Sequence, residues 1–155
     1  MPLYRDFSDD KATILLWKYD EKEELNSQFL VEAENYEKIK DYHPTKLKEL
    51  LLVRKILKSV LPDHKILYRD REPFLFPQDF EISVTHSFPY AALAISKSKI
   101  GIDIEPFNPK IKRIQHKFLN EDEAHFIEKE KEVAYLTVIW SLKDSLYKIH
   151  HSNYW

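Results

Sequence analysis

The sequence predicts an α+β fold, with a small sheet and one long helix first and mainly helices afterwards. Apolar runs typical of strands occur at residues 12–19 and 80–96. Between these two runs, residues 43–61 repeat leucine at helical spacing. From residue 108 onward the pattern is helical. We therefore expect one part at 1–98 and a second part at 99–155.

The composition excludes several classes of site. The 155 residues include no cysteine, so disulfides and thiolate metal sites are excluded. The 24 Lys and Arg nearly balance the 26 Asp and Glu, which gives no indication of nucleic-acid binding. Gly101 is the only glycine, whereas a P-loop or a G-x-G-x-x-G turn needs several. A bound nucleotide must therefore be held by side chains and a metal.

The N-terminus predicts no targeting segment. "MPLYRDFSDD" lacks the apolar stretch of a signal peptide. No run approaches the roughly 18 apolar residues that a membrane span needs. We expect a cytoplasmic protein without a membrane or nucleic-acid partner.

The elements of the first part follow from local patterns. "ATILLWKY" (12–19) predicts a strand, and 43–61 predicts a helix with Pro44 near its start. The proline-rich segment 62–79 predicts a loop with one short strand. "FEISVTHS" (80–87) alternates, and "YAALAIS" (90–96) is its expected hairpin partner. The core candidates of the helix are Leu47, Leu50, Leu51, Leu57 and Leu61.

The second part begins with a predicted strand at 100–105. Asn108 and Pro109 are typical of a helix start, and Asn120 with Glu123 resembles a capping box for a helix at 121–130. A long helix is expected at 132–151. Its core candidates are Val133, Leu136, Ile139, Trp140 and Leu146.

Two carboxylates lie on one face of the segment "IGIDIE" (100–105). The isoleucines face one side, and Gly101, Asp103 and Glu105 face the other. Like charges this close repel unless they are solvated or bridged by a cation. One interpretation is an exposed strand face, and the other is a Mg²⁺ site with oxygen ligands. Gly101 would let another group approach the backbone.

The long helix presents a second polar group. Trp140, Asp144 and Lys148 are spaced i, i+4, i+8 and share a face. Asp144 and Lys148 are either a surface ion pair or, opposite the first two acids, a third oxygen ligand with a neighbouring cation.

These segments resemble the signature motifs of the 4′-phosphopantetheinyl transferases. "IGIDIE" (100–105) and "WSLKDSLYK" (140–148) are similar to its two main motifs, G-[IV]-D-[IV]-E and W-x-x-K-E-[SA]-x-x-K. "ISVTHS" (82–87) and "LLVRKIL" (51–57) are similar to two upstream motifs. The resemblance is to the larger, pseudo-dimeric type. It implies that family's fold of two pseudo-symmetric lobes, at 1–98 and 99–155, with the second lobe truncated.

The resemblance also implies roles for individual residues. Mg²⁺ would be held by Asp103, Glu105 and Asp144, and Lys148 would act near the attacking serine as base or charge stabiliser. Glu123 is implied as another base or outer metal ligand, with the capping box as an equally good account. Coenzyme A contacts are implied for Arg54, Arg71, Thr85, His86, Lys143 and Lys148.

The implied reaction is Mg²⁺-dependent transfer of 4′-phosphopantetheine. A serine of an apo acyl or peptidyl carrier protein attacks the β-phosphate of coenzyme A, and 3′,5′-ADP leaves. Such phosphoryl transfer needs positioning and charge neutralisation, which a carboxylate-held metal supplies. The resemblance does not distinguish among carrier proteins or pathways, or give the oligomeric state.

Three features depart from the family pattern. Asp144 stands where the family usually has glutamate. "REP" (71–73) replaces the frequent Gly-Lys-Pro, so Glu72 stands in place of lysine, and Arg71 is the expected compensation. The chain ends at "HHSNYW", before the strands with which family members continue. A non-catalytic relative that binds coenzyme A or a carrier protein is therefore the alternative.

A local basic segment follows the first motif. Its cationic residues are Lys110, Lys112, Arg113, His116 and Lys117. It predicts either a docking surface for an acidic carrier protein or an ordinary solvated helix face.

Overall fold

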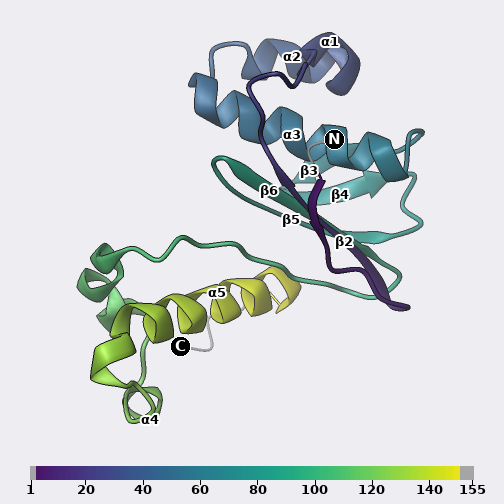
Figure 1. Ribbon diagram of the computed structural model, residues 1–155. Coiled ribbons are helices and arrows are strands. Elements are labelled where there is room, and N and C mark those ends of the chain that lie inside the picture. The colour runs from purple at the N-terminus through teal and green to yellow at the C-terminus, as the bar shows by residue number, and fades with distance from the viewer. Residues whose placement is uncertain (1–2, 151–155) are drawn as a thin grey trace.

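The computed structural model describes residues 3–150, apart from the side chains at 28, 29 and 34. Helices and antiparallel strands mix, as expected for an α+β fold (Figure 1). Four strands form one sheet in the order β1 (Leu3–Asp6), β2 (Ala12–Lys18), β6 (Tyr90–Ser96) and β5 (Glu81–Ser87). The strands predicted at 12–19, 80–87 and 90–96 are confirmed, whereas β1 was not predicted.

A separate hairpin connects the long helix with β5. It consists of β3 (Lys65–Arg69) and β4 (Glu72–Phe76), where the sequence predicted only one short strand. Its two-residue turn holds Asp70 and Arg71 at φ values of 50° and 72°. Positive φ at both central residues is what a tight hairpin turn requires, although glycine or asparagine usually supplies it. The turn was missed because arginine, unlike aspartate, is not a typical residue at such a position.

The helix α3 (Pro44–Val60) confirms the helix predicted at 43–61. His43 caps its start by accepting from the N–H of Thr45, and Pro44 occupies the first turn. Ile56 and Leu57 of α3 pack with Leu93 of β6 in the main core. A smaller cluster joins Leu51 to α1 (Ser27–Leu30) and α2 (Ala33–Ile39), which were not predicted.

After β6 the described chain contains helical turns and no further strand. These are η1 (Pro109–Arg113), η2 (Gln115–Lys117), α4 (Glu121–Ala124), η3 (Lys129–Lys131) and α5 (Glu132–His150). The helix predicted at 121–130 is therefore wrong beyond Ala124, whereas the long helix is confirmed up to His150. Residue 151, its predicted end, lies outside the described residues. In Figure 1, α5 and α3 lie on opposite sides of the sheet.

The core predictions for α5 are partly wrong. Leu136 is fully buried and Trp140 is partly buried, but Leu146 is 56% exposed. Within residues 3–150, no helix has the length and apolarity to cross a membrane.

Candidate functional site

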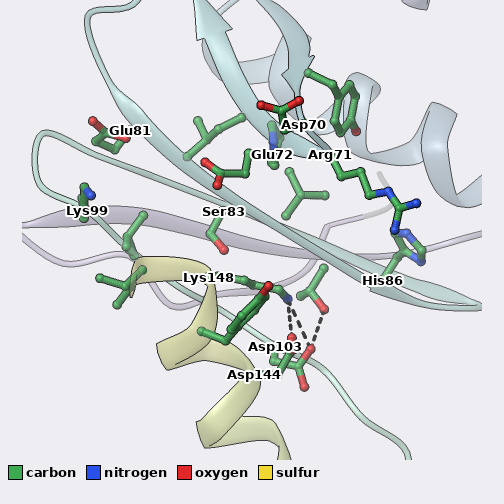
Figure 2. A pocket seen from close by; sticks show the side chains of 18 residues that line it. Asp70, Arg71, Glu72, Glu81, Ser83, His86, Lys99, Asp103, Asp144 and Lys148 are labelled. Atoms are coloured by element: carbon green, nitrogen blue, oxygen red, sulfur yellow. Dashed lines mark hydrogen bonds and ion pairs between the residues drawn. The ribbon is translucent and has the colours of Figure 1, made fainter. Parts of the chain in front are cut away.

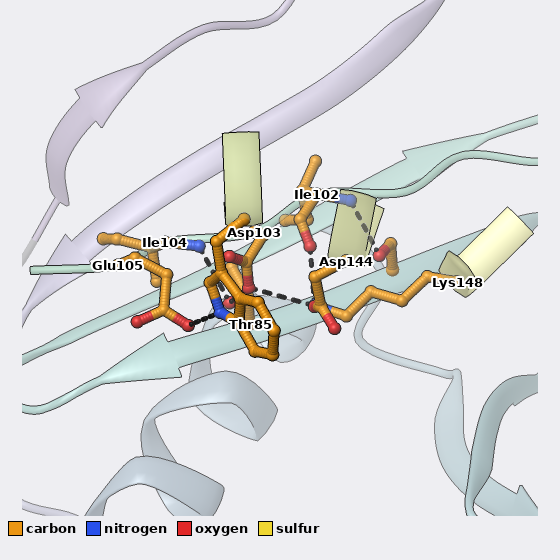
Figure 3. A network of polar contacts seen from close by, with 9 residues as sticks. Thr85, Ile102, Asp103, Ile104, Glu105, Asp144 and Lys148 are labelled. Atoms are coloured by element: carbon orange, nitrogen blue, oxygen red, sulfur yellow. Dashed lines mark hydrogen bonds and ion pairs between the residues drawn. The ribbon is translucent and has the colours of Figure 1, made fainter. Parts of the chain in front are cut away.

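The segment 100–105 lies beside β5 without forming a strand, so the predicted strand is wrong. Ser83 Oγ accepts from the N–H of Ile102 at 3.0 Å, and Thr85 Oγ1 accepts from the N–H of Ile104 at 3.1 Å (Figure 3). The hydroxyl groups of β5 take the place of backbone carbonyls, and both Ser83 and Thr85 are buried. The N–H groups of Ile102 and Ile104 are thus paired with side-chain hydroxyls instead of with the backbone carbonyls of a neighbouring strand.

Gly101 allows α5 to approach this segment closely. A Cβ built at Gly101 would lie 2.0 Å from the backbone oxygen of Ser145 and 3.2 Å from Ile149 Cγ1. Gly101 has no positive φ, so its backbone conformation does not require glycine. Glycine is needed because α5 leaves no room for a Cβ. The expectation that another group approaches here is confirmed, and that group is the backbone of α5.

The close approach brings the two motifs together. Lys148 Nζ of α5 donates to the carbonyl of Ile102 at 2.8 Å and lies 3.4 Å from Asp103 Oδ1. The same ammonium lies 2.9 Å from Asp144 Oδ2 (Figure 3). Lys148 therefore bridges the two carboxylates, so the Asp144–Lys148 pair is more than an isolated surface ion pair.

Asp103 is the most buried acid of this group, with a side chain that is 6% exposed. Its Oδ1 accepts from Thr85 Oγ1 at 3.2 Å and faces Lys148. Its Oδ2 is buried with no hydrogen-bond partner. A buried carboxylate oxygen without a partner is costly, so this atom is suited to accept a ligand or cation.

Glu105 lies at the other end of the segment. Its Oε1 accepts from the indole N–H of Trp140 in α5 at 3.1 Å. Burial raises the pKa of Glu105 above its ordinary value, and the charges of Asp103 and Asp144 raise it further against the opposing effects of Trp140 and Lys148. The site therefore carries an excess of negative charge.

These observations fit a divalent cation at Asp103. The donors are hard carboxylate oxygens, one oxygen is buried and unpaired, and a cation would relieve the repulsion at Glu105. Among residues 3–150, however, no three acidic, histidine or cysteine side chains converge closely enough to hold a metal as they stand. Binding would require Glu105 or Asp144 to turn toward Asp103.

An open cleft of about 800 Å³ lies beside this cluster. Asp103, Asp144 and Lys148 line one side of it, and the β3–β4 turn lines another (Figure 2). Arg71 and His86 also line the cleft, and both are labelled in Figure 2. The resemblance puts glycine at position 71, and the φ of 72° at Arg71 is a conformation that glycine adopts readily.

Thr85 also lines the cleft, but its hydroxyl is already engaged. It accepts from Ile104 and donates its single proton to Asp103. The hydroxyl therefore orients Asp103.

Four predicted site residues do not line the cleft: Arg54, Glu105, Glu123 and Lys143. Arg54 is buried, and its Nη1 donates to the carbonyl of Leu50 within α3. Lys143 donates to the carbonyl of Phe118 and lies 2.7 Å from Glu123 Oε2.

Glu123 forms the capping box with Asn120, so the capping interpretation is confirmed. Burial acts to raise its pKa, but the N–H of Asn120 and the Lys143 ammonium hold the pKa of Glu123 below its ordinary value.

Comparison with known proteins agrees with the two motifs. The model of the 4′-phosphopantetheinyl transferase superfamily matches residues 99–155. This match confirms the resemblance to that superfamily over residues 99–155, which include both main motifs. The chain is also 33% identical over 123 residues to the 4′-phosphopantetheinyl transferase gsp of Aneurinibacillus migulanus. That alignment covers 73% of the chain and 50% of the relative, so the chain spans about half the length of this relative.

Two residues of the site were not recognised from the sequence. Ser83 holds the segment 100–105 together with Thr85, and its position two residues before Thr85 in an apolar strand was the available signal. Glu49 contacts His86 from α3, and it is the only acidic residue of that helix. Nothing in the local pattern indicates which strand a lone acid on a helix will meet.

Proposed function

We propose that the protein transfers 4′-phosphopantetheine from coenzyme A to a serine of an apo carrier protein, in a Mg²⁺-dependent reaction. The main support is the cluster in which Asp103, Asp144 and Lys148 meet beside the cleft, with one buried oxygen of Asp103 unpaired. The named relative, a 4′-phosphopantetheinyl transferase, supports the same activity. We further propose a cytoplasmic location and two pseudo-symmetric lobes, 1–98 and 99–155.

In this proposal the acids hold the metal and the cleft binds coenzyme A. Asp103, Glu105 and Asp144 would hold Mg²⁺, which when bound neutralises charge on the pyrophosphate of coenzyme A. Arg71 and His86 offer a guanidinium and an imidazole to a phosphate group in the same cleft.

The transfer exchanges one phosphorus–oxygen bond for another. The serine oxygen bonds to the β-phosphorus, the bridging oxygen leaves with the electron pair as part of 3′,5′-ADP, and the serine proton passes to a base. The resemblance offers Lys148 and Glu123 as that base. Lys148 lines the cleft and Glu123 does not, which favours Lys148. The two implied roles need different forms of Lys148: the neutral amine would accept the serine proton, whereas the ammonium next to three oxygens would stabilise charge.

The basic segment supports a carrier protein as the partner. Its cationic side chains are exposed, and Lys112 is tied to Glu132 of α5 by an ion pair of 2.6 Å. Phe107, 70% exposed, precedes this segment. An exposed aromatic ring next to cationic side chains suits a partner with an acidic, partly apolar helix.

Intact mass of an apo acyl carrier protein tests the proposal. The protein, coenzyme A and Mg²⁺ should add one phosphopantetheine to the carrier, and EDTA or Asp103→Ala should abolish the addition. Asp10→Ala, the same change at an exposed acid, should retain it. Absence of the addition from a protein that melts cooperatively would contradict the transferase activity.

The second candidate function is binding of coenzyme A or a carrier protein without transfer. It is supported by the Lys148 ammonium between Asp103 and Asp144, together with the lack of three converged ligands within residues 3–150. Asp144→Glu distinguishes the two, because the longer side chain extends the carboxylate by one methylene. Activity that appears or rises in this variant identifies a weakened enzyme.

A further inference from the structure

Glu49 joins the long helix to the end of β5. Its Oε2 lies 3.1 Å from His86 Nδ1, and its Oε1 accepts from the backbone N–H of Phe88 at 2.9 Å. The Glu49 side chain is only 15% exposed although it carries a charge. Both carboxylate oxygens are therefore committed, one to the imidazole and one to the turn that follows it.

His86 faces the cleft with one ring nitrogen already bound. Its side chain is 45% exposed and lines the cleft. In residues 3–150 the only partner of the ring is Glu49, at Nδ1. Arg71 lines the same cleft. Nε2 is thus the ring atom that remains for a ligand.

A carboxylate at one imidazole nitrogen fixes the ring in two ways. It prevents rotation of the ring about its bond to Cβ, and it makes Nδ1 the nitrogen that carries a proton. A ring that also carries a proton on Nε2 can then donate to an anionic oxygen while its opposite side faces the carboxylate. This arrangement suits recognition of a phosphate group in the cleft, which Arg71 also lines.

We infer that Glu49 is a positioning residue that orients His86 Nε2 toward a phosphate group of coenzyme A. The inference rests on the proposed function for the identity of the ligand. It adds a residue of α3 to the site, whereas the metal cluster is built from the motifs at 100–105 and 140–148. Glu49 itself does not line the cleft, so it acts through His86.

A structural role of Glu49 in the turn would have different consequences. If Glu49 only anchored the N–H of Phe88, its removal would loosen the turn whether or not His86 were present. If it orients His86, its effect on binding must disappear when the imidazole is removed. A double-mutant cycle separates these two cases.

The first experiment is calorimetric titration of coenzyme A, with Mg²⁺ present, into the four proteins of this cycle and one control variant. Glu49→Ala should weaken binding about tenfold in the wild-type background and less than about twofold in His86→Ala. Glu37→Ala, which removes an exposed glutamate paired with Lys40, should leave the affinity unchanged. A tenfold loss that persists in His86→Ala would overturn the inference.

The second experiment needs no ligand and no variant. Long-range ¹H–¹⁵N NMR spectra of the wild-type protein should show His86 with its proton on Nδ1. A ring protonated only on Nε2 would contradict the inference even if Glu49→Ala failed to fold. Absence of coenzyme A binding by the wild-type protein would count against the proposed function. Binding without coupling between Glu49 and His86 would count against the inference alone.

Discussion

Replacement of Gly101 by alanine should destabilise the fold, because α5 occupies the space that a Cβ would need. The added atom would lie 2.0 Å from Ser145 O and 2.9 Å from Ser145 C, whereas ordinary contacts begin at 3.4 Å. Both atoms belong to the helix backbone, so no side-chain rotation can relieve the overlap. Either α5 or the segment 100–105 must move.

The expected steric cost is about 2 kcal/mol, from which a smaller entropic gain is subtracted. Overpacking of a well-filled site costs roughly 1–3 kcal/mol. Alanine restricts the unfolded chain and returns about 0.4–1 kcal/mol where the native φ is accessible to it, and Gly101 has no positive φ. The steric term therefore exceeds the entropic term, and the net effect is a loss of stability.

Urea unfolding followed by tryptophan fluorescence and by circular dichroism measures this loss. Trp140 lies in α5, so it adds a signal from the displaced helix to the emission of Trp17 and Trp155. Ser98→Ala, at an exposed position in the same connecting segment, is the matched control and should change little. A Gly101→Ala protein as stable as the wild type would refute the reasoning that close packing of α5 requires glycine here.

Three further predictions concern the site. Without metal, Glu105→Gln should raise the melting temperature near neutral pH. The raised pKa means that the folded state binds the Glu105 proton more tightly, so wild-type stability falls as pH rises from the ordinary to the raised pKa. The stability difference between the variant and the wild type should therefore shrink as pH is lowered through that interval, and an advantage independent of pH would contradict this. Thr85→Val should weaken Mn²⁺ binding by about tenfold, because it removes the hydroxyl that orients Asp103. Electron paramagnetic resonance measures this binding, and Thr85→Ser, which keeps the hydroxyl, should restore it. Equal loss in both variants would point to packing instead. Arg71→Gly should leave the melting temperature equal or higher, because glycine accepts a φ of 72°, yet weaken coenzyme A binding in calorimetry. Asp70→Gly relieves a similar φ while removing an anion, and a comparable loss of binding there would exclude a specific role for the Arg71 guanidinium.

Three of the four strands of the sheet and the two long helices could be predicted because their patterns are local. Alternation in β5 and β6, and the leucine spacing of α3, depend only on which side chains face the core. The turn at Asp70 and Arg71 was not predicted, because aspartate tolerates positive φ but arginine at the second position is not a signal for such a turn.

The site was partly predictable for a similar reason. The spacing of Asp103 and Glu105, and of Asp144 and Lys148, correctly indicated which side chains share a face. The segment 100–105 has the alternation of a strand, yet the hydroxyls of Ser83 and Thr85 replace the ladder, and no local pattern distinguishes these cases. The commitment of Lys143 to Phe118 and Glu123 likewise depends on contacts between elements far apart in sequence.

The most direct test of the account is a calorimetric titration of coenzyme A into the wild-type protein, with Mg²⁺ and then with EDTA. The account predicts binding that depends on Mg²⁺ and is lost in Asp103→Asn, because the unpaired oxygen of Asp103 is the buried ligand atom. Equal affinity in Mg²⁺ and EDTA, or unchanged binding by Asp103→Asn, would contradict the claim that the two motifs meet to form a metal-dependent coenzyme A site.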